Sequence, residues 1–290
     1  MGLTIACTNQ KGGVGKTTTV VNLSTYLALA GDRVLVIDLD PQGNATSGFG
    51  VERPGDNGSA YEALIGTLSL RDLAVSTPIE NLQLVPSSIA LAGAEVELAT
   101  EDARERRLAR ATRGIADTWD WIFVDCAPSL GLLTVNALTA ADAVLVPIQC
   151  EYYALEGLSQ LIATVNLVRD HLNPNLQMAG AVLTMYDGRT NLSSDVAAEV
   201  RRHLGDVVFE TVIPRNVRLS EAPSHGLPIA LYRDESRGAA AYRSLANEWR
   251  ARHASKRTST TSEPAGIDRP VLDNVIEAID DRTLVGAGAE

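Results

Sequence analysis

Cysteine is scarce in this chain of 290 residues, and long apolar runs are missing. The three cysteines, Cys7, Cys126 and Cys150, stand far apart with no CxxC motif, which argues against a disulfide framework and against a zinc site. We expect buried thiols in a reducing cytosol. No apolar stretch approaches the roughly 20 residues of a membrane span, and the N-terminal run LTIACT lacks the features of a signal peptide. The sequence predicts a cytoplasmic protein with no membrane partner.

Positive charge is in deficit: 25 Lys and Arg stand against 36 Asp and Glu, for a formal net charge of −11. With 45% hydrophobic residues, this composition suits a soluble globular protein and disfavours one coated in positive charge for nucleic acid or anionic membranes. The deficit is uneven. Residues 1–184 hold 11 basic and 20 acidic side chains, whereas residues 185–253 hold ten arginines and nine acids. An anionic partner is therefore least disfavoured in the second segment.

Short β-branched runs alternate with longer helical patterns from the start of the chain. Residues 3–8, 17–30 and 33–38 form a βαβ pattern, which predicts a parallel sheet covered by helices. We expect further strands at 82–86, 121–126, 143–148 and 179–184, and helices at 88–117, 131–140, 154–171, 192–204 and 236–252. The strands are apolar almost throughout, as burial on both faces requires. The predicted class is α/β, with a mostly parallel, twisted sheet and helices on both faces.

The composition changes after His253, where the Ser-, Thr-, Pro- and Gly-rich segment ASKRTSTTSEPAGIDRP begins. We expect one domain over residues 1–253 and an acidic, disordered tail over residues 254–290. Within the tail, VLDNVIEAIDDRTLV can form an amphipathic helix, but its acidic polar face disfavours binding to anionic membranes. A docking peptide for a partner is the alternative to a solubilising tail.

A glycine-rich segment, NQKGGVGKTT over residues 9–18, lies between the first expected strand and the first long helix. A P-loop requires this context, since backbone N–H groups and the start of a helix together bind phosphate. Lys16 would reach the β- and γ-phosphates, and the Thr17 hydroxyl would ligate Mg²⁺. The ordinary pattern fails at its first glycine, which is Gln10, and Lys11 is an addition. Two of the three lysines in the chain therefore stand in this loop.

The fold is thus predicted to be P-loop NTPase-like. The loop that is predicted to bind the nucleotide comprises Lys11, Gly12, Gly13, Val14, Gly15, Lys16, Thr17 and Thr18.

Two of the expected strands end in carboxylates, in DLDPQGNAT and in WIFVDCAPSLG. The carboxyl ends of parallel strands meet at the mouth of such a site. Asp125 fits the Walker B pattern and would hold Mg²⁺ directly or through a water, although a helix cap is the alternative. Asp40 lies at the mouth of the site. Asp38 points the same way on an extended strand, and we expect it to accept hydrogen bonds behind the site.

The nucleotide base is predicted to be adenine, which makes ATP with Mg²⁺ the expected ligand. An NKxD motif for guanine is impossible, because no lysine occurs between Lys16 and Lys256. GxSxG, HExxH and clustered histidines are also missing, so nucleophilic or zinc-dependent hydrolysis has no support.

The loop KGGVGKTT resembles the deviant Walker A loop of the ParA/MinD family of ATPases. DLDPQGN, FVDCAPS and VIPRNVRLSEAPSHGLPI follow in the family's order, over residues 3–252, and the last segment is similar to that of chromosomal ParA (Soj) proteins. The resemblance implies that Lys11 reaches across a homodimer to phosphates bound by the other subunit. It also implies that Asp40 positions or activates the attacking water. Lys11, Lys16 and Asp40 are therefore the predicted catalytic residues.

The same resemblance assigns residues to the base and to DNA. Pro214 and Asn216 match the residues that line the base, with Arg215 stacking or pairing nearby. Arg189 and Arg218 match arginines that contribute to nonspecific DNA binding. From composition alone, solvated surface arginines are the alternative.

The implied function is an ATP-dependent partitioning ATPase for a chromosome or plasmid, associated with the nucleoid. Its ATP-bound dimer would bind double-stranded DNA without sequence preference and release it after hydrolysis. A ParB-type centromere-binding partner would stimulate that hydrolysis. Because we expect no leading helix-turn-helix domain, a chromosomal system is favoured.

Two alternatives share the loop. A MinD-like membrane-surface ATPase would need a basic amphipathic C-terminal helix, which the acidic tail disfavours. An iron–sulfur ATPase like the nitrogenase iron protein would need two suitably placed thiolates per chain, and the spacing of Cys7 and Cys126 does not match.

Overall fold

We describe residues 2–52, 58–115, 117–151 and 154–258 of the computed structural model. Within them, seven strands form one sheet in the order β3-β4-β2-β5-β1-β6-β7. The strands are β1 (Leu3–Cys7), β2 (Val34–Leu39), β3 (Val75–Ser76), β4 (Leu82–Val85), β5 (Trp121–Cys126), β6 (Ala143–Gln149) and β7 (Gln177–Thr184). Only β3 runs antiparallel to its neighbour; every other adjacent pair in the described sheet is parallel. The expected mostly parallel sheet is confirmed.

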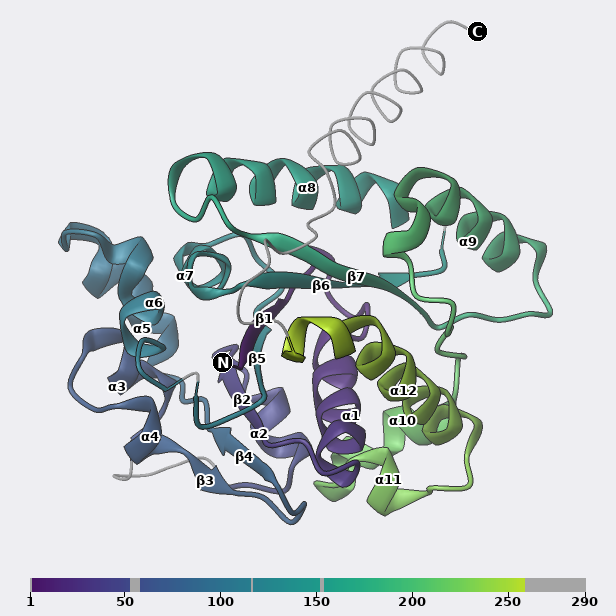
Figure 1. Ribbon diagram of the computed structural model, residues 1–290, viewed down its shortest axis with the longest axis horizontal. Helices are drawn as coiled ribbons and strands as arrows, with labels where there is room; N and C mark the ends of the chain where they lie inside the picture. The colour runs from purple at the N-terminus through teal and green to yellow at the C-terminus, as the bar shows by residue number, and fades with distance from the viewer. Residues whose placement is uncertain (1, 53–57, 116, 152–153, 259–290) are drawn as a thin grey trace, which may run out of the picture.

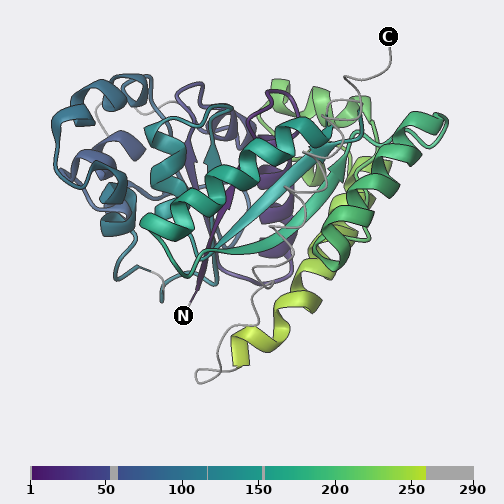
Figure 2. The same cartoon turned by 90° about the horizontal axis from the view of Figure 1, so that it is seen from above.

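Helices cover both faces of the sheet (Figure 1). One face packs against α1 (Lys16–Leu29), α2 (Asn44–Gly48), α10 (Val217–Glu221), α11 (Ile229–Tyr232) and α12 (Arg237–Thr258). The other packs against α3 (Ala60–Ile65), α4 (Leu70–Leu73), α5 (Leu91–Glu97), α6 (Arg107–Ala111), α7 (Leu132–Ala140), α8 (Ala154–His171) and α9 (Asn191–Leu204). Figure 2 shows α8 crossing the strands. Short 3-10 helices are η1 (Leu98–Thr100), η2 (Arg104–Arg106), η3 (Gly205–Val207) and η4 (Ala222–His225).

Two apolar cores, one on each side of the sheet, bury the strands. All six residues of β2 are buried. Since successive side chains of a strand point to opposite faces, Leu35 and Ile37 join the core under α3 to α9, whereas Val34 and Val36 join the core under α1 and α12. The sheet is therefore held on both faces, which fixes where the loops at its carboxyl edge emerge.

The single helix expected over 88–117 is wrong. The chain forms α5, η1, η2 and α6 there instead. Ala103, just before η2, has a φ of 51°, a left-handed conformation that a continuing helix does not contain. The sequence pattern also does not predict the two-residue strand β3 or the short helices α2, α3 and α4.

The last expected helix corresponds to α12, which continues to Thr258. His253 is 5% exposed and stacks on Trp249, with ring centroids 4.4 Å apart. The packed core thus reaches residue 253, where we expect the domain to end. Residues 259–290 of the predicted tail lie outside the described residues.

Candidate nucleotide-binding site

The glycine-rich loop joins the end of β1 to the start of α1, at the carboxyl edge of the sheet. Gly13 and Gly15 have φ values of 75° and 90°, a left-handed region that glycine enters without strain. Lys16 is only 7% exposed, and its Nζ donates a hydrogen bond to the Lys11 carbonyl oxygen at 3.2 Å. Its ammonium group therefore lies folded against the loop that is predicted to hold phosphate.

Side chains from the neighbouring strands hold this loop in place. Thr184 Oγ1, at the end of β7, donates to the Val14 carbonyl oxygen at 2.8 Å. Asn9 Nδ2 donates to the Pro147 carbonyl oxygen of β6 at 2.8 Å, and Asn9 Oδ1 accepts from the Lys11 amide at 3.0 Å. Because these bonds order the loop before a ligand arrives, they lower the entropic cost of binding.

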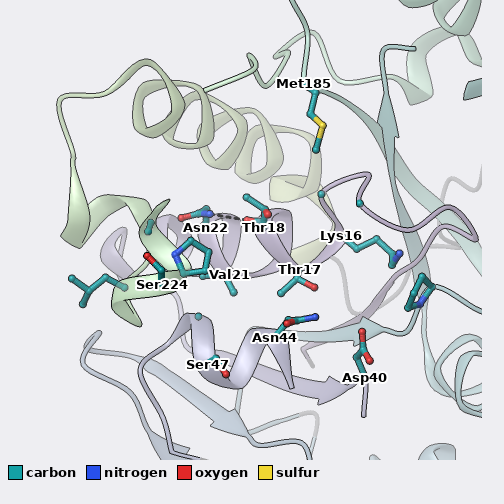
Figure 3. A pocket seen from close by; sticks show the side chains of 17 residues that line it. Lys16, Thr17, Thr18, Val21, Asn22, Asp40, Asn44, Ser47, Met185 and Ser224 are labelled. Carbon is teal, nitrogen blue, oxygen red and sulfur yellow. Dashed lines mark hydrogen bonds between the residues drawn. The ribbon is translucent and has the colours of Figure 1, made fainter. Parts of the chain in front are cut away.

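A cavity of about 490 Å³ opens beside the loop. Figure 3 shows Lys16, Thr17 and Asp40 at one end of it and Asn22 and Ser224 at the other. A volume of this size is typical of small-molecule sites. Five of the eight residues of the predicted nucleotide-binding loop line the cavity, namely Gly13, Gly15, Lys16, Thr17 and Thr18. The other three, Lys11, Gly12 and Val14, do not line it.

Asp125 is fully buried at the end of β5, and neither carboxylate oxygen has a hydrogen-bond partner among the described residues. Burial raises its pKa well above the usual value, and the negative charge of Asp38 adds to the shift, whereas the neighbouring Thr17 hydroxyl and Lys16 oppose it. Orphaned carboxylate oxygens next to the Thr17 position fit a hard divalent cation, which would supply the missing partner. The site therefore fits Mg²⁺ held by Asp125 and Thr17.

Asp38 and Asp40 have different surroundings, although both are buried. Asp38 accepts hydrogen bonds from the Thr46 amide and hydroxyl, each at 2.7 Å, and from the Asp40 amide at 3.3 Å. Burial raises the pKa of Asp38 to about 6 despite these bonds. Asp40 Oδ1 accepts from the Gln42 amide at 2.9 Å, and Asp40 lines the cavity. Asp38 therefore anchors α2 behind the site, whereas Asp40 faces into it.

Lys11 points to a carboxylate and not into the cavity. Its Nζ lies 3.7 Å from Glu151 Oε2, and Arg215 Nη2 lies 2.9 Å from Glu151 Oε1. One carboxylate after β6 thus contacts both the extra lysine of the loop and the predicted base-binding arginine. The sequence does not single out Glu151, because it comes near these residues only through the order of the strands.

The predicted base-binding residues lie next to the cavity without lining it. Pro214 forms a β-bridge with Tyr186, and the Arg215 amide donates to the Tyr186 carbonyl oxygen at 3.0 Å. Asn216 caps α10, with its Oδ1 accepting from the Arg218 amide at 2.8 Å. The loop is thus bound to Tyr186, the residue that follows Met185, and Met185 does line the cavity.

Met185 is a site residue that the sequence reasoning misses. It follows the last residue of β7 and has a φ of 52°. A bulky side chain in the left-handed region costs about 1 kcal/mol or more, and such strain is concentrated at ligand sites. Its position after the carboxyl end of a parallel strand is the signal that could have identified it.

Arg189 and Arg218, the predicted DNA-binding residues, are exposed; Arg189 lies in the loop between β7 and α9, and Arg218 lies in α10. Arg189 Nη2 lies 2.7 Å from Asp187 Oδ2, and Arg218 Nη1 lies 2.6 Å from Glu221 Oε2. Each is thus paired with a carboxylate that lies two or three residues away in the chain.

The three cysteines are buried and unbridged, as expected. Burial raises the pKa of each thiol, to about 11 for Cys150. The described residues contain no group of three or more His, Cys, Asp and Glu side chains arranged to bind a metal. Among them, no helix has both the length and the apolar composition that crossing a bilayer requires.

The sequence is similar to one family model and to two proteins named Soj and ParA. A family model described as an AAA domain matches residues 2–178. The chain is 57% identical over 248 residues to the sporulation initiation inhibitor protein Soj of Bacillus subtilis, covering 86% of this chain and 98% of that protein. It is 52% identical over 256 residues to the chromosome partitioning protein ParA of Myxococcus xanthus, with coverage of 88% and 90%.

Solved structures share the fold. A cobyrinic acid a,c-diamide synthase of Mycobacterium smegmatis with bound ADP and magnesium matches with a TM-score of 0.77 and 39% identity, covering 91% of this chain and all of that one. The cell division ATPase MinD of Pyrococcus furiosus matches with a TM-score of 0.71 and 27% identity, covering 86% and 98%. The predicted P-loop NTPase-like fold is therefore confirmed.

Proposed function

This chain belongs to the ParA/MinD family of ATPases, among the chromosome-partitioning Soj and ParA proteins, and from that premise we propose that it is a partitioning ATPase switched by ATP. Its ATP-bound homodimer binds double-stranded DNA without sequence preference. Hydrolysis, weak in the chain alone and stimulated by a ParB-type partner, releases the DNA. The protein then acts in the cytoplasm on the nucleoid, in a chromosomal system.

The loop, Lys16 and the two acidic strand ends carry the nucleotide chemistry. Loop amides and the start of α1 bind the phosphates, and Lys16 turns from the Lys11 carbonyl toward the β- and γ-phosphates. Thr17 and Asp125 hold Mg²⁺, which when bound neutralises the charge that develops on the phosphates. Asp40 faces the cavity and positions the attacking water.

Lys11 has the freedom to act on a second subunit. Its ion pair with Glu151 is long, at 3.7 Å, and its side chain is 37% exposed. Exposed pairs of this kind contribute little stability. Lys11 can therefore leave Glu151 and reach phosphates held by the other copy, with Pro214, Arg215 and Asn216 beside the base.

For the function of this chain, the Soj and ParA relatives are stronger evidence than the similarity to the synthase. Identities of 57% and 52% extend over nearly the whole of those two proteins. The synthase structure is 39% identical. MinD, at 27%, supports the fold, but the tail that would carry a membrane-binding helix lies outside the described residues.

The single observation that carries the proposal is Asp125 with two orphaned oxygens beside a preformed P-loop. Steady-state ATPase rates test it, measured for the chain alone, with DNA, with the cognate centromere-binding protein, and with both. We expect a low rate alone and synergy when both are present. Lys16→Ala should abolish the stimulated rate, and Lys256→Ala, which removes a lysine outside the loop, should leave it unchanged. A rate that does not respond to the two partners together would contradict the proposal.

A further inference from the structure

Each of the two arginines assigned to DNA is neutralised by a carboxylate that lies two or three residues away in the chain. Arg189 makes a bidentate ion pair with Asp187, with Nε 2.8 Å from Oδ1 and Nη2 2.7 Å from Oδ2. Arg218 Nη1 donates to Glu221 Oε2 at 2.6 Å, and the Tyr232 hydroxyl donates to the same oxygen at 3.1 Å. The guanidinium of Arg189 lowers the pKa of Asp187 to about 2, and that of Arg218 lowers the pKa of Glu221. Both carboxylates are therefore ionised at neutral pH.

The chain segments that lead to these two ion pairs lie side by side at the β7 edge of the sheet (Figure 1). One is the loop between β7 and α9, and the other is the segment just before α10. The Tyr186 amide donates to the Ile213 carbonyl oxygen at 3.0 Å, and the Arg215 amide donates to the Tyr186 carbonyl oxygen at 3.0 Å. Arg189 follows Tyr186 by three residues, and Arg218 follows Arg215 by three. Both ion pairs thus belong to one region of the surface.

We propose that Asp187 and Glu221 set the DNA affinity of this region by competing with phosphate for Arg189 and Arg218. The inference rests on the proposed function, since it concerns the same DNA-binding surface. Nonspecific DNA binding depends on cations that neutralise phosphates and release their counterions. A guanidinium that is already bound to a carboxylate must exchange that acceptor for phosphate, and its net contribution is smaller.

The competition is one that phosphate can win, because both pairs face solvent. The Arg189 and Arg218 side chains are 87% and 46% exposed. Exposed ion pairs are weak and are screened by salt. A single copy of the chain therefore offers DNA little net charge, whereas two copies held together by ATP present both regions at once and bind through them jointly. The carboxylates in this way keep DNA binding dependent on the dimer.

Asp187→Asn and Glu221→Gln test the competition, because each removes one charge and keeps the shape of the side chain. Binding is measured with a labelled double-stranded DNA of arbitrary sequence, in Mg²⁺ with ATP and with ADP. We expect each variant to bind about two- to fivefold more tightly than the wild type with ATP, and to bind measurably with ADP. Asp195→Asn is the matched control, an exposed carboxylate on α9 outside both ion pairs, and should change the affinity much less.

A double-mutant cycle separates competition from a general change in charge. Asp187→Asn should lose its effect when Arg189 is already alanine, because no guanidinium is left to release. Three results would overturn the inference: no gain in either variant, equal gains from Asp187→Asn and Asp195→Asn, or the same gain with and without Arg189. Absence of DNA binding by the wild type with any nucleotide would contradict the proposed function itself, and the inference with it.

Discussion

Asp125→Asn is expected to stabilise the ligand-free chain and to remove its response to Mg²⁺. The Asp125 carboxylate is fully buried, and neither oxygen has a hydrogen-bond partner among the described residues. Burial and the charge of Asp38 both disfavour its ionised form. A side chain that lowers stability in the free protein is typical of a functional position. The substitution keeps the shape and removes the charge.

The size of the effect follows from two opposing contributions. An uncompensated charge in a protein interior costs several kcal/mol, although the nearby Lys16 offsets part of this here. The asparagine amide is also buried and costs about 1–3 kcal/mol where it lacks partners. The difference predicts a gain of about 1–3 kcal/mol. For a domain of this size, that corresponds to a rise in Tm of roughly 2–10 °C.

Thermal unfolding in EDTA measures this gain, and a second series with saturating ADP, with and without Mg²⁺, measures the metal response. We expect Mg²⁺ to raise the Tm of the ADP-bound wild type and to leave that of Asp125→Asn unchanged. Asp38→Ala is the control: it removes the oxygen that accepts both 2.7 Å bonds from Thr46, leaves these two donors without that acceptor, and should lower the Tm in EDTA. A lower Tm for Asp125→Asn in EDTA, or an undiminished Mg²⁺ response, would refute the reasoning.

Two further variants, and one control variant, test the backbone and the loop around the site. In Gly226→Ala the new Cβ would lie 2.9 Å from the Gly50 Cα, at a φ of 65°, so we expect urea unfolding to show a loss of about 2–4 kcal/mol. Gly114→Ala, with a φ of 83° but no atom within 4 Å of the Cβ, should lose only about 1 kcal/mol, and equal losses would contradict the clash. Thr184→Val removes the 2.8 Å bond to the Val14 carbonyl and should weaken ADP binding by about five- to tenfold in a titration, whereas an unchanged Kd would show that this bond does not order the loop.

The parts of the site that are local in sequence could be predicted. The P-loop and Asp40 each follow a buried strand, Asp125 lies at the end of another, and the carboxyl ends of parallel strands meet at one edge. The sheet brings them together: Asp38 stands opposite Asp125 in the register of β2 and β5. The α/β class was predictable for the same reason, since apolar strands alternate with helical segments.

Contacts between distant segments could not be predicted. Glu151 meets Lys11 and Arg215 only because β1, β6 and β7 are neighbours in the sheet. Met185 enters the cavity through a left-handed backbone that no methionine pattern indicates. The single helix predicted over 88–117 is wrong because helix-forming composition does not reveal where the chain turns.

Retention on DNA of unrelated sequence tests the central claim most directly, with the wild type, Lys16→Ala and Arg218→Glu each measured with ATP, with ADP and without nucleotide. The account predicts that the wild type is retained with ATP and Mg²⁺, that rising salt releases it, and that both variants lose retention. Equal retention of all three proteins, with or without ATP, would contradict it.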